Sequence, residues 1–209
     1  MTLAVVTNWW TPTRPGSMGL PSPAYDVALL TEDGREAGVD EDGEICLRLP
    51  DGARPLGLFS GYADDPATTA KVWHDGYYHS HDLARRDADG YFWYVGRTDD
   101  MIKTSGYRVG PFEVESVVME HPAVKECAIT GSPHPVRGLV VKATVVVAPG
   151  FTPGDDLAKD IQTFVKERTA PYKYPRIVEF VEAMPVTISG KIRRVQIRES
   201  DARSAQRDG

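Results

Sequence analysis

Lys191 is the residue of this sequence best suited to act on a charged substrate. It follows Gly190 in the segment PVTISGKIRR and precedes Arg193 and Arg194. A flexible ammonium on a glycine turn can reach into a cleft and meet a phosphate or carboxylate oxygen as a point charge. The same pattern also describes a solvated lysine in a basic loop, and one lysine alone does not separate these two interpretations.

Two further side chains have the chemistry of a nucleotide contact. Asp82, which ends the segment YHSHD, offers a carboxylate that can accept two hydrogen bonds from a ribose diol. Arg97 offers a guanidinium that can hold a sugar or a phosphate. Each residue has a plainer alternative, because Asp82 also suits a strand-end cap or a turn and Arg97 also suits a surface salt bridge with Asp99 or Asp100.

The histidines and cysteines do not predict a metal site. His79 and His81 alternate on one predicted strand, but two ligands without a third are weak grounds for a metal. We interpret both as partly exposed strand residues. Cys46 and Cys127 are far apart and lack the paired spacing of a zinc knuckle, so they are expected to be two buried thiols in a reducing compartment.

The elements that must position these residues change in type along the chain. The first half is predicted to be β-rich, with apolar alternation in each strand and Gly or Asp at the turns. A short helix is expected to open at Pro66, with Asp64 or Asp65 as its N-cap. The strands are predicted at residues 25–29, 44–49, 77–83 and 91–95.

The segment Gly96 to Glu115, GRTDDMIKTSGYRVGPFEVE, divides the chain. Its charges and glycines favour a polar, bent connector over a core element. A helix is predicted to begin at Pro111, because proline suits the first helical position and valines follow at helical spacing. The connector therefore delivers the chain from one folded block into another.

The second half predicts helices against a short sheet. A helix over 111–121 precedes strands at 124–130 and 139–148, a helix at 155–168 and a strand at 177–181. The run Leu139 to Ala148 is almost continuously apolar, so it must be covered on both faces. The fold class is therefore α+β. We expect a β-rich subdomain over residues 1–97, a compact α+β domain over residues 98–200 and a disordered tail over residues 201–209.

The composition excludes several classes of partner. The chain of 209 residues has a formal net charge of −6, which disfavours a nucleic-acid backbone or an anionic membrane as the main partner. No stretch approaches the length of a membrane span. The N-terminal apolar run, Leu3 to Val6, has no cationic lead, so we expect a cytoplasmic protein.

Together and in this order, these segments resemble the adenylate-forming acyl-CoA synthetases, and among them the medium-chain and acetate-type acid–CoA ligases. The resemblance runs from about Pro15 to about Ser200. RPGSMGLPSPAYDV resembles the entry to the last, barrel-like subdomain of the family's large domain, and DGEICLR resembles its Gly-Glu strand motif. APYKYPR is the more particular signal of resemblance, because the medium-chain subgroup carries it. The resemblance implies a distorted-barrel subdomain, then a hinge and a C-terminal lid.

The resemblance assigns roles in adenylation, in which a carboxylate attacks the α-phosphate of ATP. YHSHD resembles a Tyr-x-x-x-Asp motif whose aspartate binds the ribose, which implies that role for Asp82. The connector is similar to the signature that closes the large domain. It implies a nucleotide contact for Arg97, the hinge for Asp99 and a phosphate contact for Arg108. PVTISGKIRR matches the terminal motif, so the catalytic lysine is expected to be Lys191.

The resemblance also implies a second step, in which the thiol of coenzyme A displaces AMP. A rotation of the lid about Asp99 is expected to move Lys191 away from the reacting groups. The same rotation is expected to bring in the face that carries Ser105, Gly106 and Tyr107. The residues expected to bind coenzyme A share this face or the subgroup motif: Ser105, Gly106, Tyr107, Arg137, Lys166, Tyr174, Pro175 and Arg176.

The family's phosphate loop, carboxylate pocket and Thr-Glu pair are not found in this sequence, which begins where that glutamate would stand. Mg²⁺ is therefore expected only through ATP, with no protein ligand here. We expect part of an ATP-dependent acid–CoA ligase that is inactive alone. Its partners would be the nucleotide, coenzyme A, the carboxylic acid and a large domain in trans. The alternatives are a non-catalytic module that binds coenzyme A or a partner, and an inert truncated remnant.

Overall fold

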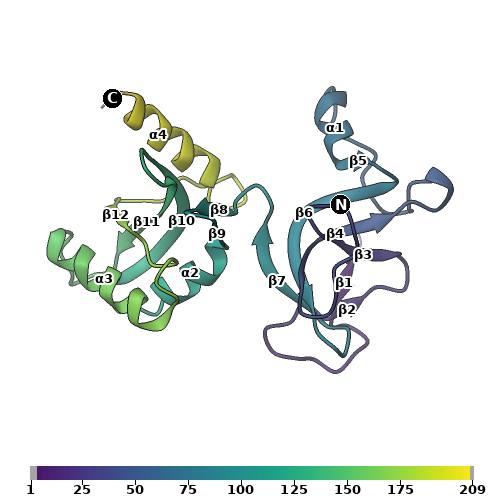
Figure 1. The fold of residues 1–209 in the computed structure, drawn as a ribbon, viewed down its shortest axis with the longest axis horizontal. Coiled ribbons are helices and arrows are strands. Elements are labelled where there is room, and N and C mark those ends of the chain that lie inside the picture. The colour runs from purple at the N-terminus through teal and green to yellow at the C-terminus, as the bar shows by residue number, and fades with distance from the viewer. Residues whose placement is uncertain (1–3, 208–209) are drawn as a thin grey trace. The chain divides into compact units, whose positions relative to one another are not determined.

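The chain folds into two compact units, Met1–Asp99 and Asp100–Gly209. The computed structural model describes residues 4–207, and Figure 1 shows the elements of both units. The division falls between Asp99 and Asp100, two residues after the predicted boundary. Of the predicted N-terminal run, Leu3 lies outside the described residues, and the first strand is β1 at Val6–Thr7.

Unit 1 is built on an antiparallel sheet with the order β3-β4-β6-β5, in which β7 also pairs with β6. Leu29, Ile45 and Phe92 fill its core. The predicted β-rich pattern is confirmed. The elements after β1 are β2 (Leu20–Pro21), β3 (Val27–Leu30), β4 (Asp42–Arg48), η1 (Pro50–Gly52), α1 (Pro66–Val72), β5 (Trp73–His74), β6 (Tyr77–Arg86) and β7 (Phe92–Arg97).

The helix α1 begins where the sequence predicts. The Asp65 side chain accepts a hydrogen bond from the backbone N–H of Thr68 at 2.8 Å, and Pro66 occupies the first turn. An N-cap of this kind satisfies one of the donors that a helix start leaves unpaired. Of the two cap candidates, the structure therefore selects Asp65.

Unit 2 is a sheet covered by helices, which confirms the α+β class. The sheet has the order β10-β11-β8-β9, and β12 runs parallel to β11 at its side. The elements are β8 (Ile102–Thr104), β9 (Tyr107–Val109), α2 (Pro111–Val118), β10 (Val124–His134), β11 (Gly138–Val147), α3 (Asp155–Arg168), β12 (Ile177–Phe180) and α4 (Arg194–Arg207). The helix α3 has the predicted bounds.

The strand β11 lies between two packed layers. Val141 and Val145 belong to a core with Val114 of α2 and Ile161 of α3. On the other side, Val146 packs with Ile197 of α4 and with Met184 and Ala128. Figure 1 shows α4 on one side of the unit 2 sheet and α2 and α3 on the other. The predicted burial of this strand on both faces is confirmed.

The connector differs from the prediction. Residues 102–109 form the hairpin β8–β9, and Ile102 and Val109 are almost fully buried in the core of unit 2. The hairpin joins the sheet through the pair Gly138↔Thr104. Most charges and glycines of the segment lie at its start and at its turn. They dominate its composition, so the alternation of Ile102 and Val109 with polar residues was not recognised as a strand pattern.

The predicted disordered tail is helical over residues 201–207, as part of α4. The Lys142 ammonium, from the middle of β11, forms ion pairs with Asp201 and with Glu179. Burial of Ile197 on the sheet fixes the same helix one turn earlier. These contacts with β11 supply the stabilisation that the polar sequence of the tail lacks by itself.

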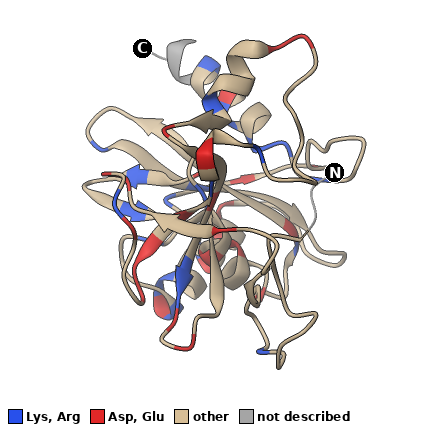
Figure 2. Cartoon of the chain, turned by 90° about the vertical axis from the view of Figure 1, so that its right-hand side faces the viewer, with Lys and Arg blue, Asp and Glu red and all other residues tan. Residues whose placement is uncertain are grey.

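Charged residues are spread over both units. Figure 2 shows Lys and Arg interspersed with Asp and Glu along the ribbon. Many of these charges are paired on the surface, for example Arg35 with Glu41 and Arg48 with Asp26. Among the described residues, no helix has the length and apolar character that crossing a membrane requires.

Candidate functional site

A bulge in β6 positions Asp82. From His79 to Leu83 the strand β6 advances four positions while its partner β4 advances two, from Cys46 back to Glu44. The extra residues bend the strand, and His81 takes a left-handed conformation with φ 63°. Such a conformation is strained for a residue other than glycine, and strain of this kind persists where surrounding contacts hold it.

Asp82, Arg97 and Asp99 form one chain of contacts. Asp82 and Arg97 are direct partners on β6 and β7. Arg97 Nη1 lies 3.4 Å from Asp82 Oδ1, and Arg97 Nε donates to Asp99 Oδ1 at 2.9 Å. The Asp82 side chain is 39% exposed, so it stays accessible to a ligand. The structure thus brings together three of the predicted site residues.

The two carboxylates beside Arg97 have opposite pKa shifts. Burial raises the pKa of Asp82, and the positive charge of Arg97 only partly offsets this effect. For Asp99, burial also acts to raise the pKa, but the hydrogen bond and the charge of Arg97 outweigh it and the pKa is lowered. Arg97 therefore compensates the burial of Asp99 fully and the burial of Asp82 only in part. A further hydrogen-bond donor would stabilise the ionised form of Asp82.

Lys191 lies on an exposed turn of unit 2. Gly190 N donates to Thr187 O at 2.9 Å, and Thr187 N donates to Lys191 O at 2.8 Å. Lys191 N donates in turn to the Thr187 side chain at 3.0 Å. Gly190 has φ 80°, a conformation that glycine adopts without strain. The turn fixes the backbone at Lys191 and leaves its side chain on the surface, as the sequence predicts.

The turn is tied to the start of unit 2 by Arg194. Its guanidinium donates from Nη2 to both carboxylate oxygens of Glu115, at 2.8 and 2.7 Å. Arg194 Nη1 also lies 3.9 Å from Asp100, which forms a second ion pair with Arg198. This network was not predicted from the sequence. The repeated arginine of KIRR was its only signal, and the partners are 79 or more residues away.

The predicted coenzyme A residues lie in two groups within unit 2. In the first, Ser105 and Gly106 form the two-residue turn of β8–β9, with φ 48° and 83°. Arg137 Nη1 donates to Ser105 Oγ at 3.2 Å. Tyr107 stacks on Tyr172, with ring centroids 4.1 Å apart and planes 9° from parallel. Tyr172 was not among the predicted residues, although it belongs to the quoted segment APYKYPR.

The second group is centred on Tyr174. Arg176 Cζ lies 5.1 Å from the centre of the Tyr174 ring, and its Nη1 donates to the Tyr174 hydroxyl at 3.1 Å. Lys166 Nζ lies 5.7 Å from the same ring. Pro175, which stands between Tyr174 and Arg176 in the sequence, is buried. Two cations over one aromatic ring form a surface suited to a phosphate or a purine.

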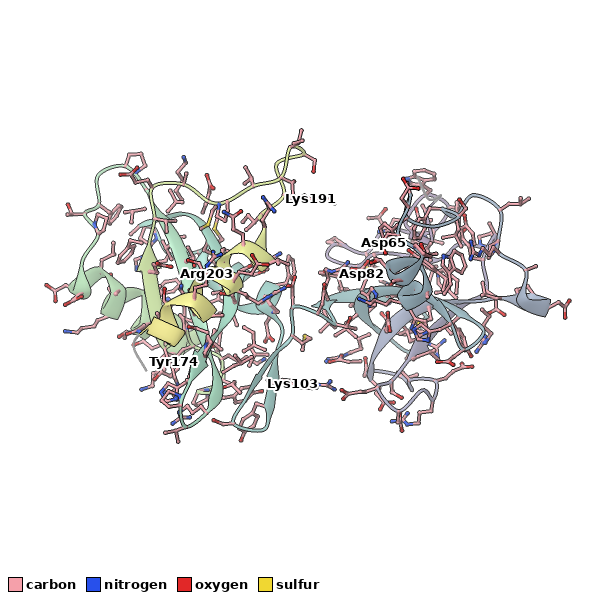
Figure 3. The ribbon with its side chains drawn as sticks, turned by 90° about the horizontal axis from the view of Figure 1, so that it is seen from above. Asp65, Asp82, Lys103, Tyr174, Lys191 and Arg203 are labelled. Carbon is pink, nitrogen blue, oxygen red and sulfur yellow. The ribbon has the colours of Figure 1, made fainter. Side chains whose placement is uncertain are left out.

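The predicted residues divide between the units. Asp82, Arg97 and Asp99 belong to unit 1, and Arg108, Lys191 and the coenzyme A groups belong to unit 2. Arg108 is exposed on β9, opposite Lys103 of β8. Figure 3 shows Lys191 well separated from both Lys103 and Tyr174. The lysine predicted for adenylation and the residues predicted for coenzyme A are therefore on different parts of unit 2.

His79 has neighbours that the sequence analysis did not consider. Its Nδ1 lies 3.5 Å from Cys46 Sγ and 3.1 Å from Glu44 Oε2. The metal interpretation of His79 and His81 was disfavoured because a pair of histidines without a third ligand is weak evidence. The two additional donors come from β4 instead, and only strand pairing brings them to His79.

Comparison with known proteins gives consistent matches. Residues 113–191 match the AMP-binding enzyme C-terminal domain. The mouse (Mus musculus) mitochondrial acyl-coenzyme A synthetase ACSM3 is 50% identical over 191 residues, covering 90% of this chain and 33% of that protein. The 4-hydroxybutyrate–CoA ligase 1 of Metallosphaera sedula is 48% identical over 202 residues, covering 96% of this chain and 35% of that protein.

Solved structures agree with these matches. The anthranilate CoA ligase AuaEII, solved with anthranoyl-AMP, has a TM-score of 0.80 and 34% identity, covering 93% of this chain and 36% of that one. The chain thus spans about a third of the length of the relatives it matches. These matches show that the chain carries the AMP-binding enzyme C-terminal domain and is similar, over most of its length, to the C-terminal portion of acyl-CoA synthetases.

Proposed function

We propose that this chain is the C-terminal part of an AMP-forming acid–CoA ligase of the medium-chain or short-chain type. The observation that carries the proposal is the contact chain Asp82–Arg97–Asp99, which ends at the boundary between the two units. A ribose-binding carboxylate, a nucleotide-binding guanidinium and a hinge residue would then be coupled through one side chain.

In the first step a substrate carboxylate oxygen attacks the α-phosphorus of ATP, and the bond to pyrophosphate breaks. Asp82 accepts hydrogen bonds from the ribose hydroxyls and so fixes the nucleotide. Lys191 contributes a positive charge to the oxygens on which negative charge builds, which is electrostatic preorganisation without proton transfer. Mg²⁺ enters with ATP and neutralises its phosphates. Arg108 is proposed as a further phosphate contact.

In the second step the sulfur of coenzyme A attacks the acyl carbon, the thiol proton is lost, and AMP leaves. Lys191 and the Ser105–Gly106 turn lie on different parts of unit 2, so one orientation of this unit cannot be expected to serve both steps. We propose that Asp99 is the hinge whose φ and ψ angles change between them. The Arg194–Glu115 pair would keep the Lys191 turn and the start of unit 2 moving together.

The proposal also states what this chain does not do by itself. The family's phosphate loop motif does not occur in the 209 residues, so we infer that the isolated chain forms no acyl-adenylate. The large domain of the family would have to be supplied, in the same chain or in trans. The predicted cytoplasmic location stays a prediction, since the mouse relative is named as mitochondrial.

A chimera tests the proposal directly. The C-terminal third of the Metallosphaera sedula ligase would be replaced by this chain, and acid-dependent exchange of labelled pyrophosphate into ATP would be measured. We expect exchange in the chimera, loss of at least about a hundredfold in Lys191→Ala, and unchanged exchange in the control Lys125→Ala. Lys125 is a similarly exposed lysine of unit 2. Equal exchange in Lys191→Ala would contradict the catalytic assignment, and exchange by the isolated chain would contradict its inactivity.

A second candidate function is a module that binds coenzyme A without catalysis. It is favoured by one specific observation: both predicted coenzyme A groups consist of residues of unit 2. Calorimetry of the isolated chain with coenzyme A distinguishes this module from an inert remnant. Heat of binding together with exchange protection of the Ser105–Tyr107 backbone supports the module, and the absence of both supports the remnant.

A further inference from the structure

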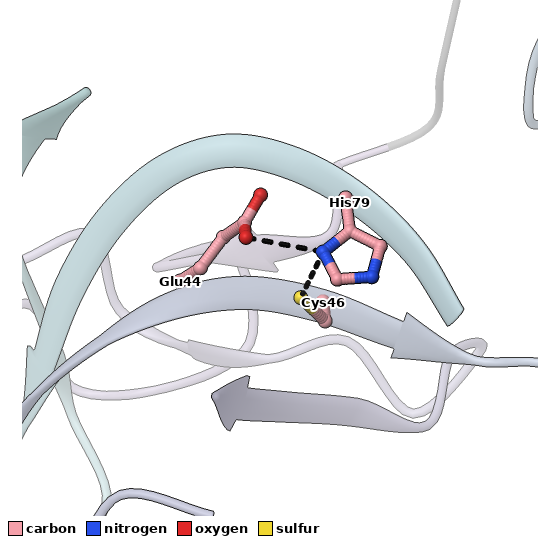
Figure 4. Close-up of side chains that lie close together, drawn as sticks. All are labelled: Glu44, Cys46 and His79. Atoms are coloured by element: carbon pink, nitrogen blue, oxygen red, sulfur yellow. Dashed lines mark hydrogen bonds and ion pairs between the residues drawn. The ribbon is translucent and has the colours of Figure 1, made fainter. Parts of the chain in front are cut away.

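Three side chains that the proposed ligase chemistry does not use meet on one face of the unit 1 sheet. Glu44 and Cys46 are two positions apart on β4, so their side chains point to the same side. His79 is the direct partner of Cys46 on β6. Figure 4 shows one imidazole nitrogen of His79, Nδ1, in contact with both the thiol sulfur and the carboxylate. The donor atoms of the three residues all lie within 4.8 Å of one another.

The bulge in β6 fixes the orientation of Glu44 in this group. The backbone N–H of His81 donates to Glu44 Oε1 at 2.7 Å, which holds the carboxylate against the strand. The second oxygen, Oε2, is then directed at His79 Nδ1. The orientation of Glu44 is thus fixed from two sides.

Hydrogen bonding satisfies the three groups only weakly, because one hydrogen on His79 Nδ1 would be shared between the Glu44 carboxylate and the Cys46 sulfur, which is a weak acceptor. A hydrogen on His79 Nδ1 serves the Glu44 carboxylate but leaves the Cys46 thiol hydrogen without an acceptor on the imidazole. A lone pair on Nδ1 accepts the thiol hydrogen but then faces the carboxylate oxygen, another acceptor. The other ring nitrogen, Nε2, is buried with no hydrogen-bond partner among the described residues. Groups buried in such a conflict call for a physical explanation.

A metal ion removes the conflict at Nδ1, because the sulfur, the imidazole nitrogen and the carboxylate oxygen can all direct lone pairs at it. With Zn–S near 2.3 Å and Zn–N near 2.0 Å, tetrahedral geometry separates a sulfur and a nitrogen ligand by about 3.5 Å. Cys46 Sγ and His79 Nδ1 are 3.5 Å apart. Thiolate, imidazole and carboxylate are all ligands of zinc, and three protein ligands leave a fourth position for water.

The group is also enclosed. Cys46 is fully buried, and the side chains of His79 and Glu44 are 12% and 16% exposed. The imidazole of His79 is covered on one side by His74, whose ring stacks on it with centroids 3.8 Å apart. Enclosure strengthens the attraction between a cation and its ligands and excludes competing water.

We propose that Glu44 Oε2, Cys46 Sγ and His79 Nδ1 bind one Zn²⁺ ion in unit 1. On binding, the Cys46 S–H bond breaks, its proton leaves to solvent, and the sulfur bonds to zinc, with no change of oxidation state. The His79 imidazole binds as the neutral form with its hydrogen on Nε2. The ion would stabilise the bulge that also carries Asp82, so the site has a structural effect near the proposed nucleotide contact.

The test uses the complete chain, freed of metal with a chelator and titrated with Co²⁺ as a spectroscopic substitute for Zn²⁺. We expect one ion per chain, near-ultraviolet charge transfer from a thiolate to cobalt, and displacement of the signal by Zn²⁺. Cys46→Ser should abolish the charge-transfer band. The matched control is Cys127→Ser, which removes an equally buried thiol from unit 2 and should leave the band unchanged. Absence of the band in the folded wild type, or its persistence in Cys46→Ser, would overturn the proposal.

A second variant tests the site independently, in case Cys46→Ser does not fold. Glu44→Gln has the same shape and still accepts the hydrogen bond from His81 N–H, so the bulge should stay intact. We expect its Zn²⁺ affinity, measured by competition with a chromophoric chelator, to fall by at least about tenfold, with circular dichroism unchanged. An unchanged affinity in folded Glu44→Gln would exclude Glu44 as a ligand and overturn the three-residue site.

Discussion

Arg194 and Glu115 are 79 positions apart in the sequence, and in the structure one guanidinium nitrogen of Arg194 donates to both carboxylate oxygens of Glu115. Glu115 Oε1 also accepts the backbone N–H of Ile129 at 2.9 Å. The carboxylate thus joins α2, β10 and the beginning of α4. Arg194 follows Lys191 by three residues, so its pair with Glu115 links the proposed catalytic lysine to the core of unit 2.

Replacing Glu115 should destabilise unit 2. In Glu115→Gln the amide still accepts the hydrogen bond of Ile129, but the partly buried guanidinium of Arg194 loses its closest charged partner and keeps the longer contact with Asp100. We expect the free energy of unfolding to fall by about 2–3 kcal/mol, as measured by urea denaturation. Glu120→Gln, at an exposed position just after α2, is the control and should change stability by less than about 0.5 kcal/mol. Equal effects of the two variants would contradict the structural role of the pair.

Two aspartates on the β6–β7 hairpin should respond to pH in opposite ways. Burial raises the pKa of Asp82 above 3.8, so its ionised form opposes folding, and this effect grows as the pH rises through the folded pKa. Asp82→Asn removes it. We expect Asp82→Asn to be more stable than the wild type at pH 7, with the gain disappearing below about pH 4. A gain independent of pH, or a loss at pH 7, would contradict the assignment.

Asp87 is the matched comparison. The hydrogen bond from Trp93 and the charge of Arg14 lower the pKa of Asp87, so its ionised form stabilises the fold above the unfolded pKa of 3.8. This stabilisation is lost as the pH falls through the folded pKa. Asp87→Asn should therefore be less stable than the wild type at pH 7, and the deficit should narrow in acid. The measurement is urea denaturation of both variants and the wild type from acidic pH to pH 7. The difference in free energy of unfolding between variant and wild type should rise with pH for Asp82→Asn and fall with pH for Asp87→Asn.

Arg176 should contribute to binding of coenzyme A. Its guanidinium covers Tyr174 and hydrogen-bonds to the hydroxyl, which prepares its remaining donors for a phosphate. We expect Arg176→Ala to weaken binding of coenzyme A about tenfold in calorimetry. Arg168→Ala is the control, because Arg168 also covers an aromatic ring, that of Phe164, outside the predicted groups. Binding that weakens equally in both variants would point to a general charge effect.

Gly106 should matter for coenzyme A beyond its backbone conformation. Gly106 has φ 83° and Gly150 has φ 91°, and a Cβ added at either residue would meet nothing within 4 Å. Gly106→Ala and Gly150→Ala should therefore lose similar stability, about 1 kcal/mol each, from left-handed strain. If the pantetheine chain passes over Gly106, only Gly106→Ala should also weaken binding of coenzyme A. Equal affinities in the two variants would contradict that path.

Local patterns predicted much of the fold. The helix α3 has the predicted bounds because its apolar stripe, its acidic start and its basic end all lie within 14 residues. Asp65 was predictable as a cap because it precedes Pro66. The order of the charged motifs that contain Asp82, Arg97 and Lys191 indicated the resemblance to acyl-CoA synthetases, and the comparisons agree with that resemblance. The roles of the three residues stay predictions.

What the sequence by itself determined is therefore the set of local elements and the chemical character of the site residues. Only the tertiary structure decided which residues from distant segments meet. Ile102 and Val109 of the hairpin β8–β9 are buried because the hairpin pairs with β11, and residues 201–207 are helical because Lys142 and the sheet hold them. Cys46 reaches His79 through a strand pairing with a bulge. The physical reason is that hydrogen-bond ladders and ion pairs between distant segments leave no fixed spacing in the sequence.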